Sequence, residues 1–353
     1  MHICYLIAAN EPHAYWWTRY FIERGHRVSV ISYSKDEIEG ADNYHIDSHF
    51  RGPLKYITTV SGVKALIRAL KPDIVHAHYV TSQGFLALMS GFHPRMLSVW
   101  GSDIAVAPGK NPIMRMIVRQ SLESADCINS PAEHITDKIL NITDRIKRIE
   151  TYQYGVDTAY IDTIEPQKKS AKFRIISTRN FKPIYNMEIV LKSVSELRRT
   201  RYDFDFIILG KGTDEQTMSI EHYIDKYKMH DYTYFPGFVP MDTVFSYLKS
   251  SDIFISIPDT DGTPISVLEG MYCGAFPVLS DIEANREIVN NNNALLTGLS
   301  ENSIVSDIQY ALENSKLRRQ AAEFNRTLVN NKYKWLDNMK RTEQIYRDLM
   351  EHA

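Results

Sequence analysis

The alternation of short apolar strands with amphipathic helices constrains the fold of this chain more than any other feature. Residues 2–9 and 26–32 have the β-branched and aromatic composition of buried strands, and a helix over 15–24, closed by Gly25, is predicted between them. Further strands are predicted at 73–78, 95–100 and 126–130, with helices at 54–70 and 113–123. Because parallel strands need a crossover that is usually a helix, the pattern predicts an α/β fold with helices on both faces of a parallel sheet.

The alternation is interrupted at residues 154–171, where Pro, Lys, Ser and Gln gather, and it then begins again. Strands are predicted at 173–179, 204–210 and 232–238 in this second half. A chain of 353 residues is long enough for two domains. We therefore expect two Rossmann-like domains, residues 1–160 and 170–333, joined by a linker.

Composition narrows the class of protein. A hydrophobic content of 44% describes an ordinary soluble protein, and a net charge of −2 argues against nucleic-acid binding. Cys4, Cys127 and Cys273 are far apart and odd in number, so they predict neither a disulfide framework nor a metal cluster, and a reducing cytoplasm is expected. The N-terminus lacks the features of a signal peptide, and no run approaches the roughly 20 apolar residues of a membrane span.

One segment of the first half is basic. It contains Arg51, Lys55, Lys64, Arg68 and Lys71 and no acidic residue. Such a segment is suited to peripheral contact with an anionic membrane surface. A solvated helix face explains the same charges, and the sequence favours that simpler interpretation.

The most informative stretch is residues 253–289. A strand at 253–257 is followed by a turn-rich loop at 258–264, a short apolar helix at 265–273 closed by Gly274, and another strand at 277–280. Asp261 lies on the loop and Glu269 lies within the helix. A carboxylate in an apolar helix is costly unless it is paired, so Glu269 either caps a neighbouring loop or faces a ligand's hydroxyl groups. The free N–H groups at such a helix start suit an anionic ligand.

Polar and glycine residues gather where strands end, which is where doubly wound sheets bind ligands. They are Asn10, His78, Trp100 to Asp103, Arg179, Gly210 to Gly212, Gly237 and Asp259 to Pro264. Two sheets that present these edges to each other would form one cleft between the domains. Arg179 and Lys182 are suited to hold a diphosphate there, although two surface cations explain the same spacing.

Metal binding is less well supported by the sequence. Asp203 and Asp205 lie at the start of a strand, the wrong end for a site in this fold. Asp259 and Asp261 are better placed, but no nearby residue completes an oxygen ligand shell. His76 and His78 face the same side of their strand, and one packed histidine with one cleft residue fits better than a metal pair.

These residues together resemble the retaining glycosyltransferases of family 4, which have the GT-B fold. Asp261 and Glu269 with the seven residues between them match the family's acid pattern, and the segments at 24–32, 72–78, 154–157, 209–214 and 235–240 are also similar. The resemblance covers nearly the whole chain. It implies two Rossmann-like domains with parallel sheets facing an interdomain cleft, and a C-terminal helix, residues 334–353, that crosses back to the first domain.

The resemblance also implies roles for individual residues. Glu269 would bind the ribose, Asp261 (usually Glu in the family) the donor sugar's hydroxyls, and Arg179 the leaving diphosphate. The remaining donor contacts would come from Gly262, Thr263, Pro264, Ile265 and Ser266, from Gly210 and Gly212, and, beside the base, from Gly237, Phe238 and Val239. The family needs no metal and no cofactor beyond the nucleotide-sugar co-substrate, for which UDP is the expected carrier.

This chain departs from the family pattern at two positions. The second phosphate-binding cation of the family corresponds to Ile184, so either Lys182 replaces it or the role is missing. A cleft histidine of the family is replaced by Trp100, so Asp103 or His78 is expected to take part instead. We expect acceptor contacts around Asn10 to Trp17 and from His78 and Trp100. Trp16 and Trp17 are both suited to stack on sugar rings, and at least one of the two is expected in the core.

The sequence therefore predicts a cytoplasmic, metal-independent, retaining glycosyltransferase at the inner face of the cell membrane. Its substrates would be a nucleotide-sugar and a glycan or lipid-linked acceptor, as in surface polysaccharide or glycolipid synthesis. Two alternatives remain open: a metal-dependent transferase that uses Asp259 and Asp261, and a non-catalytic nucleotide-sugar-binding protein of the same fold.

Overall fold

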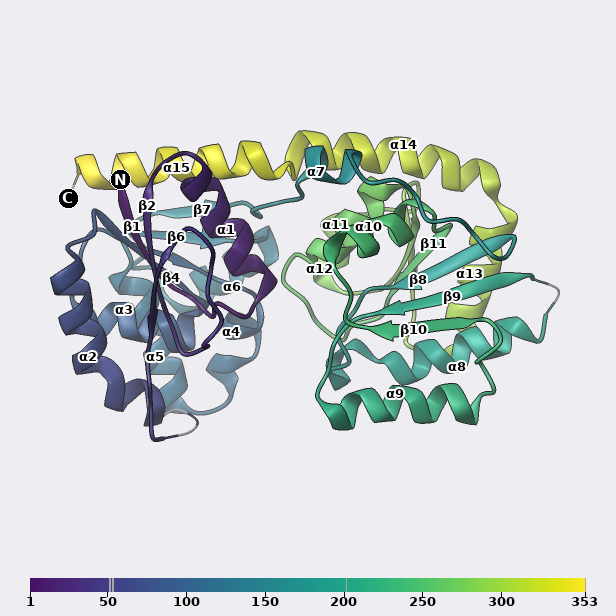
Figure 1. The fold of residues 1–353 in the computed structure, drawn as a ribbon, viewed down its shortest axis with the longest axis horizontal. Helices are drawn as coiled ribbons and strands as arrows, with labels where there is room; N and C mark the ends of the chain where they lie inside the picture. Colours follow the sequence, from purple (N-terminus) through teal and green to yellow (C-terminus); the bar gives the residue numbers. More distant parts are fainter. Residues whose placement is uncertain (51, 53, 201, 353) are drawn as a thin grey trace. The chain divides into compact units, whose positions relative to one another are not determined.

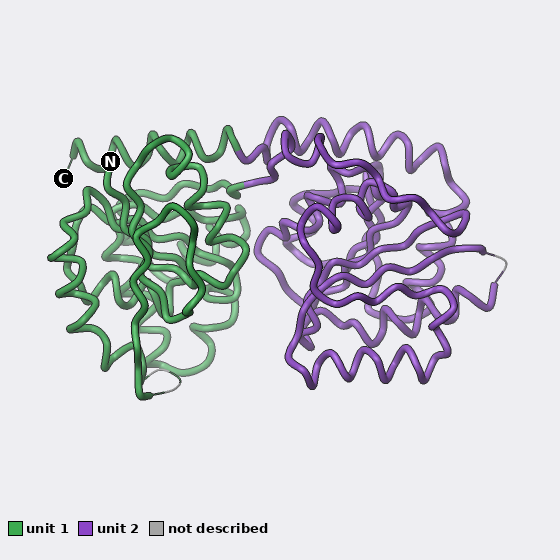
Figure 2. The backbone as a smooth tube through the Cα atoms, in the orientation of Figure 1, with its two compact units in different colours: residues 1–154, 336–353 green, residues 155–335 purple. Residues whose placement is uncertain are grey.

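The chain folds into two compact units in a computed structural model, which describes residues 1–50, 52, 54–200 and 202–352. Unit 1 comprises residues 1–154 and 336–353, and unit 2 comprises residues 155–335 (Figure 2). Residues 155–171, where the sequence suggested a linker, belong to unit 2, because Val156 and Ile161 are buried in its core.

Unit 1 is built on a seven-stranded parallel sheet in the order β3-β2-β1-β4-β5-β6-β7 (Figure 1). Its strands are β1 (His2–Leu6), β2 (Arg27–Ser32), β3 (Asp42–His45), β4 (Ile74–His78), β5 (Arg95–Ser98), β6 (Cys127–Ser130) and β7 (Ile149–Thr151). The strand order reverses direction between β1 and β4, so the carboxyl ends of these two strands mark the switch point at which doubly wound folds bind ligands.

Helices cover both faces of this sheet. They are α1 (Pro12–Glu23), α2 (Leu54–Leu70), η1 (Tyr79–Gln83), α3 (Gly84–Ser90), α4 (Ser102–Ala105), η2 (Ala107–Gly109), α5 (Pro112–Ser124), α6 (Glu133–Ile142) and α15 (Trp335–Glu351). Val75 and Ala77 of β4 share a core with α2, α3, α5 and α6. The alternate residue His76 faces the opposite side, where its Nδ1 bonds the hydroxyl of Tyr346 on α15.

Unit 2 repeats this architecture with a six-stranded parallel sheet in the order β10-β9-β8-β11-β12-β13. Its strands are β8 (Phe173–Ser177), β9 (Phe204–Leu209), β10 (Thr233–Gly237), β11 (Ile253–Ser256), β12 (Phe276–Ser280) and β13 (Leu295–Thr297). Its helices are α7 (Thr158–Asp162), η3 (Pro183–Tyr185), α8 (Met187–Arg198), α9 (Asp214–Lys226), α10 (Met241–Lys249), α11 (Ile265–Cys273), α12 (Glu283–Arg286), α13 (Glu301–Glu313) and α14 (Ser315–Lys332). One core lies under α8, α9 and α13, and a second lies under α10, α11 and α14.

The predicted fold class is confirmed: both sheets are parallel, and strands alternate with helices in each unit. Strands β3 and β7 were not predicted, because they are short edge strands with partly exposed residues and lack a long apolar run. Among the residues that the structure describes, no helix combines the length and the apolarity that crossing a membrane requires.

Candidate active site

The guanidinium group of Arg179 is the centre of the polar site in unit 2. Its Nη2 lies 2.5 Å from Oδ2 of Asp261, and its Nη1 donates to Oγ of Ser266 at 2.9 Å. The guanidinium carbon also lies 4.1 Å from the centre of the Tyr185 ring, a close cation–π contact. Arg179 is only 7% exposed, and its Nε has no hydrogen-bond partner among the described residues. The structure thus brings together three of the predicted site residues and adds Tyr185.

Neighbouring strands position these side chains. Strands β8 and β11 pair directly, so the segments that follow them leave the sheet side by side. The N–H of Asp259 donates to the carbonyl of Ile184 at 3.0 Å, and the side chain of Asn186 donates to the carbonyl of Ile257 at 3.0 Å and to Oδ1 of Asp259 at 2.7 Å. These bonds join the segment that carries Arg179 and Tyr185 to the loop that carries Asp261.

Helix α11 carries Glu269 and ends at Gly274, whose φ of 91° places it in the left-handed region. The helix packs closely on β11, because a Cβ on Gly270 would lie 2.9 Å from the ring of Phe254. Glu269 is partly buried and makes no hydrogen bond or ion pair with any described residue. Burial raises the pKa of this carboxyl group to about 8, so the acid is largely protonated at neutral pH. An unpaired carboxyl group of this kind suits a ligand that offers hydroxyl groups.

Two of the predicted glycines, Gly210 and Gly212, lie in the loop after β9 and close to the segment that carries Arg179. A Cβ on Gly210 would lie 2.4 Å from the carbonyl oxygen of Arg179, and one on Gly212 would lie 2.9 Å from the Cβ of Gln216. These two positions therefore need glycine for close packing of the loops, whatever ligand binds. Gly237 has a φ of 75°, and the following Phe238 is 70% exposed with Lys211 Nζ 5.5 Å from its ring centre.

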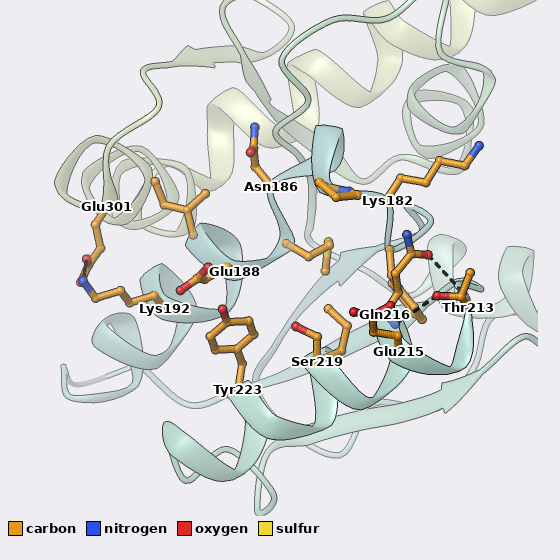
Figure 3. A pocket seen from close by; sticks show the side chains of 15 residues that line it. Lys182, Asn186, Glu188, Lys192, Thr213, Glu215, Gln216, Ser219, Tyr223 and Glu301 are labelled. Atoms are coloured by element: carbon orange, nitrogen blue, oxygen red, sulfur yellow. Dashed lines mark hydrogen bonds and ion pairs between the residues drawn. The ribbon is translucent and has the colours of Figure 1, made fainter.

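Lys182 is separate from the Arg179 group: no contact between it and Arg179 or Asp261 is present in the described part of the chain. It lies at the rim of a cavity of about 830 Å³ between α8 and α9 (Figure 3). Figure 3 shows its ammonium group directed away from Glu188 and Tyr223 on the cavity wall. The structure therefore gives no support to Lys182 as the replacement for the missing second cation.

In unit 1 the buried carboxylate of Asp103 fixes two loops. Its Oδ1 accepts the N–H groups of Trp100 at 3.1 Å and Gly101 at 2.9 Å, and its Oδ2 accepts the N–H of Val80 at 3.0 Å. The side chain is 1% exposed. Asp103 therefore holds the segments after β4 and β5 together, and the structure gives it a positioning role where a catalytic one was expected.

Aromatic rings surround His78 at the end of β4. Its ring centre lies 5.0 Å from that of Trp17, 5.8 Å from Trp100 and 6.3 Å from His13. The ring centre of His13 also lies 3.9 Å from that of Trp100. Trp16 faces elsewhere, with Arg19 lying 5.5 Å from its ring centre, and Asn10 is exposed in the turn before α1.

Tyr185 was not predicted from the sequence, and His13 was covered only as part of the predicted acceptor segment, Asn10 to Trp17. Tyr185 lies in the segment after β8, and His13 lies at the start of α1, directly after β1. Segments that follow the carboxyl ends of central strands are where ligand-binding residues are expected, so this position was the signal that could have identified both. Trp17, expected with Trp16 either to stack on a sugar ring or to belong to the core, is 1% exposed and lies against His78.

The two Asp pairs considered for metal binding are used differently. Asp205 forms a buried ion pair with Arg174 at 2.7 Å. Asp259 accepts from Asn186, whereas Asp261 pairs with Arg179. Among the described residues, no group of three His, Cys, Asp or Glu side chains is arranged as a metal site.

Comparison with known proteins identifies related sequences. The family model described as glycosyl transferase 4-like matches residues 2–131, and the one described as glycosyl transferases group 1 matches residues 162–328. One component of the phosphatidylinositol N-acetylglucosaminyltransferase of Homo sapiens is 21% identical over 358 residues, covering 95% of this chain and 72% of the relative. The N-acetyl-alpha-D-glucosaminyl L-malate synthase of Bacillus anthracis is 21% identical over 293 residues, covering 79% of this chain and 75% of the relative.

Solved structures show the same fold. Sucrose-phosphate synthase from Thermosynechococcus elongatus superposes with a TM-score of 0.85 at 13% identity and 100% coverage of both chains. HepE from Anabaena, solved in complex with UDP-glucose, superposes with a TM-score of 0.83 at 12% identity, covering 99% of this chain and 100% of HepE. The two family models together match most of this sequence, and the chain belongs to the family 4 type of glycosyltransferases with the GT-B fold.

Proposed function

We propose that this glycosyltransferase moves a sugar from a UDP-linked donor to a hydroxyl group of a glycan or lipid-linked acceptor, with retention of the anomeric configuration and without a metal. The observation that carries the proposal is the group formed by Arg179, Asp261 and Ser266 at the N-terminus of α11, with the unpaired Glu269 on the same helix. A fixed cation beside free helix N–H groups is the arrangement that a diphosphate requires.

Each part of the donor then has a partner in unit 2. Arg179 and the start of α11 would hold the diphosphate, and Glu269 would accept hydrogen bonds from the ribose hydroxyls. The exposed ring of Phe238 would lie against the base. Support comes from HepE, whose structure contains UDP-glucose, and from the two relatives whose names include an N-acetylglucosaminyl group.

The proposed chemistry follows from the charges. As the bond from the anomeric carbon to the diphosphate oxygen breaks, negative charge develops on the leaving group, and Arg179 would stabilise it. The acceptor oxygen would attack on the same face and pass its proton to the departing phosphate oxygen, which yields retention. Asp261 would hold hydroxyl groups of the donor sugar and so fix its orientation.

Unit 1 carries an exposed apolar surface, which supports the proposal that the acceptor is bound to a membrane. Leu54 and Ile57 at the start of α2, and Ile113 and Met116 at the start of α5, are each more than half exposed. Each helix connects two parallel strands and therefore runs opposite to the strand direction. Both helices contact α3, and their N-terminal ends lie at the same edge of the sheet. Lys55 also lies at this edge, and the nearby Lys110 and Arg115 are exposed. Arg51, part of the predicted basic segment, lies outside the described residues.

Apolar side chains among basic ones are suited to an anionic bilayer. We therefore place the enzyme at the cytoplasmic face of the membrane. Sedimentation with anionic and with zwitterionic vesicles tests this: Ile113→Ser with Met116→Ser should lose binding to anionic vesicles. The control Met218→Ser changes a methionine that is 59% exposed in unit 2 and should bind as the original protein does. Equal sedimentation of all three proteins would contradict this part of the proposal.

The enzymatic proposal is tested with a panel of nucleotide-sugars. One UDP-sugar should raise the melting temperature, since a ligand that binds only the native state stabilises it. Asp261→Ala and Glu269→Ala should each abolish transfer while leaving a folded protein, whereas Asp281→Ala should retain it. Transfer that continues in EDTA supports the metal-independent mechanism, and NMR of the product's anomeric proton decides retention. Full activity of both site variants would refute the assignment.

A further inference from the structure

Several buried nitrogen atoms around His78 have no hydrogen-bond partner among the described residues. They are Nδ1 and Nε2 of His78, Nε1 of Trp17 and Nε1 of Trp100. The ring centres of both tryptophans lie within 6 Å of the His78 ring, at 5.0 and 5.8 Å. His76, two residues earlier, provides the contrast, because its two nitrogens bond Tyr346 and Ser98. Packing alone therefore explains His76 and leaves the His78 group unexplained.

Buried polar groups in native proteins are almost always hydrogen-bonded, and leaving one unpaired costs free energy. An indole N–H can only donate, and a neutral imidazole donates at one nitrogen and accepts at the other. A ligand that satisfies all of these groups must both accept and donate over a short distance. Neighbouring hydroxyl groups on a ring have this property.

The same group of rings contains no charge that would favour an ion. Burial lowers the pKa of His13 and of His76 to about 3, and that of His78 well below its usual value, so these imidazoles are neutral at physiological pH. The nearby carboxylate of Asp103 already accepts three backbone N–H groups. A phosphate or carboxylate group of a ligand would find no cation among these described side chains, and its desolvation would be uncompensated.

We propose that the carboxyl edge of the unit 1 sheet holds an acceptor subsite for an uncharged ring with neighbouring hydroxyl groups, a pyranose or a cyclitol. The hydroxyl groups pair with His78, Trp17 and Trp100, and the half-buried rings of His13 and Trp100, 3.9 Å apart, form the outer wall. Aromatic faces of this kind suit the C–H surface of a sugar ring. This subsite names the acceptor's chemical class and rests on the proposed transferase function.

The test uses the full-length protein and its own tryptophan fluorescence. Methyl pyranosides, myo-inositol, L-malate and inorganic phosphate are titrated separately, with UDP titrated in parallel as the donor-side probe. We expect a neutral ring to change the emission and malate and phosphate to leave it unchanged. The pyranoside and inositol arms distinguish the two sources of the same hydroxyl chemistry.

Single substitutions identify which tryptophan takes part in binding the neutral ring. Trp100→Phe keeps an aromatic ring but removes one N–H donor, and it should weaken binding of the neutral ring about five- to tenfold. Trp17→Phe should have a similar effect, and it serves as the second variant if Trp100→Phe does not fold. Trp335, the first residue of α15, belongs to unit 2, and Trp335→Phe is the matched control: it should bind the neutral ring as the original protein does. All three variants should bind UDP unchanged.

The outcomes separate the two proposals. Malate or phosphate binding that depends on Trp100, a lack of response to every neutral ring, or neutral-ring binding that neither Trp100→Phe nor Trp17→Phe weakens would overturn the subsite. Failure of UDP to bind would overturn the donor assignment of unit 2, while the response to neutral rings would still report on unit 1.

Discussion

Asp261 and a nucleoside diphosphate compete for the same guanidinium group, and this competition leads to a prediction that differs from simple loss of binding. Without ligand, Asp261 neutralises Arg179 at 2.5 Å. A diphosphate that reaches Arg179 meets the Asp261 carboxylate as a like charge. We therefore expect Asp261→Asn to bind UDP more tightly than the original enzyme and yet to lose transfer.

The magnitude follows from the geometry. Two like charges about 5 Å apart at an effective dielectric constant of about 20 repel by about 3 kcal/mol. The Asp261 side chain is 20% exposed, so solvent screens part of this repulsion. The amide of asparagine can still accept from Arg179 but carries no charge. A net gain of about 1–2 kcal/mol remains, which corresponds to about five- to thirtyfold tighter UDP binding.

Isothermal titration with UDP measures this gain, and release of UDP from the accepted donor measures turnover. Turnover should fall by at least about a hundredfold, because a neutral amide orients the donor sugar less firmly than a carboxylate does. The control is Asp281→Asn, which removes an exposed carboxylate paired with Arg286 and should leave both quantities unchanged. Equal or weaker UDP binding by a folded Asp261→Asn protein would refute the competition.

Three further predictions concern stability and loop packing. The pKa of Glu269 is raised from 4.5 to about 8, so its stabilising contribution is complete below pH 4.5 and is lost as the pH rises through about 8. At about 1.4 kcal/mol per pKa unit, the stability lost on ionisation of Glu269 is at most about 5 kcal/mol. The melting temperature of Glu269→Gln should therefore exceed that of the original protein by an amount that grows from pH 6 to pH 9. Melting temperatures of the two proteins that change in parallel with pH would contradict this. Gly210→Ala places a Cβ 2.4 Å from the Arg179 carbonyl, and titration should show UDP binding weakened by about tenfold or more; unchanged affinity would mean that the loop adapts freely. Asp205→Ala leaves the guanidinium of Arg174, which is 2% exposed, without its partner, and urea unfolding should show a loss of about 3–5 kcal/mol, with a loss below about 1 kcal/mol counting against the buried pair.

The general fold was predictable because the spacing of apolar residues along the sequence indicates which side of each helix or strand is buried. Strands that helices cover on both faces appear in the sequence as continuous apolar runs. The predicted helices at 54–70 and 265–273 coincide with α2 and α11. Helix α1 begins at Pro12, earlier than predicted, because proline is well tolerated in the first helical turn. The polar edge strand β3 carries no such pattern and could not be recognised from the sequence.

The candidate site was predictable only in part. Arg179 and Asp261 could be placed at one edge of the sheet in advance, because both follow strands whose carboxyl ends share that edge, but their ion pair was not predicted. The role of Asp103 depends on three backbone N–H groups from two segments, and no spacing in the sequence reveals such contacts. The rings around His78 come from α1, β4 and the loop after β5, so their meeting depends on strand order.

The division of the chain between the two units has a consequence for the order in which the protein is made. Unit 2 is one continuous segment, residues 155–335, whereas unit 1 is completed only by residues 336–353. During synthesis the sheet of unit 1 emerges before α15, so its buried His76 and Tyr5 lack their partner Tyr346 until that helix has left the ribosome. The unit translated first is therefore the last to be completed, and a late stop codon that removes α15 leaves polar groups unpaired in its core.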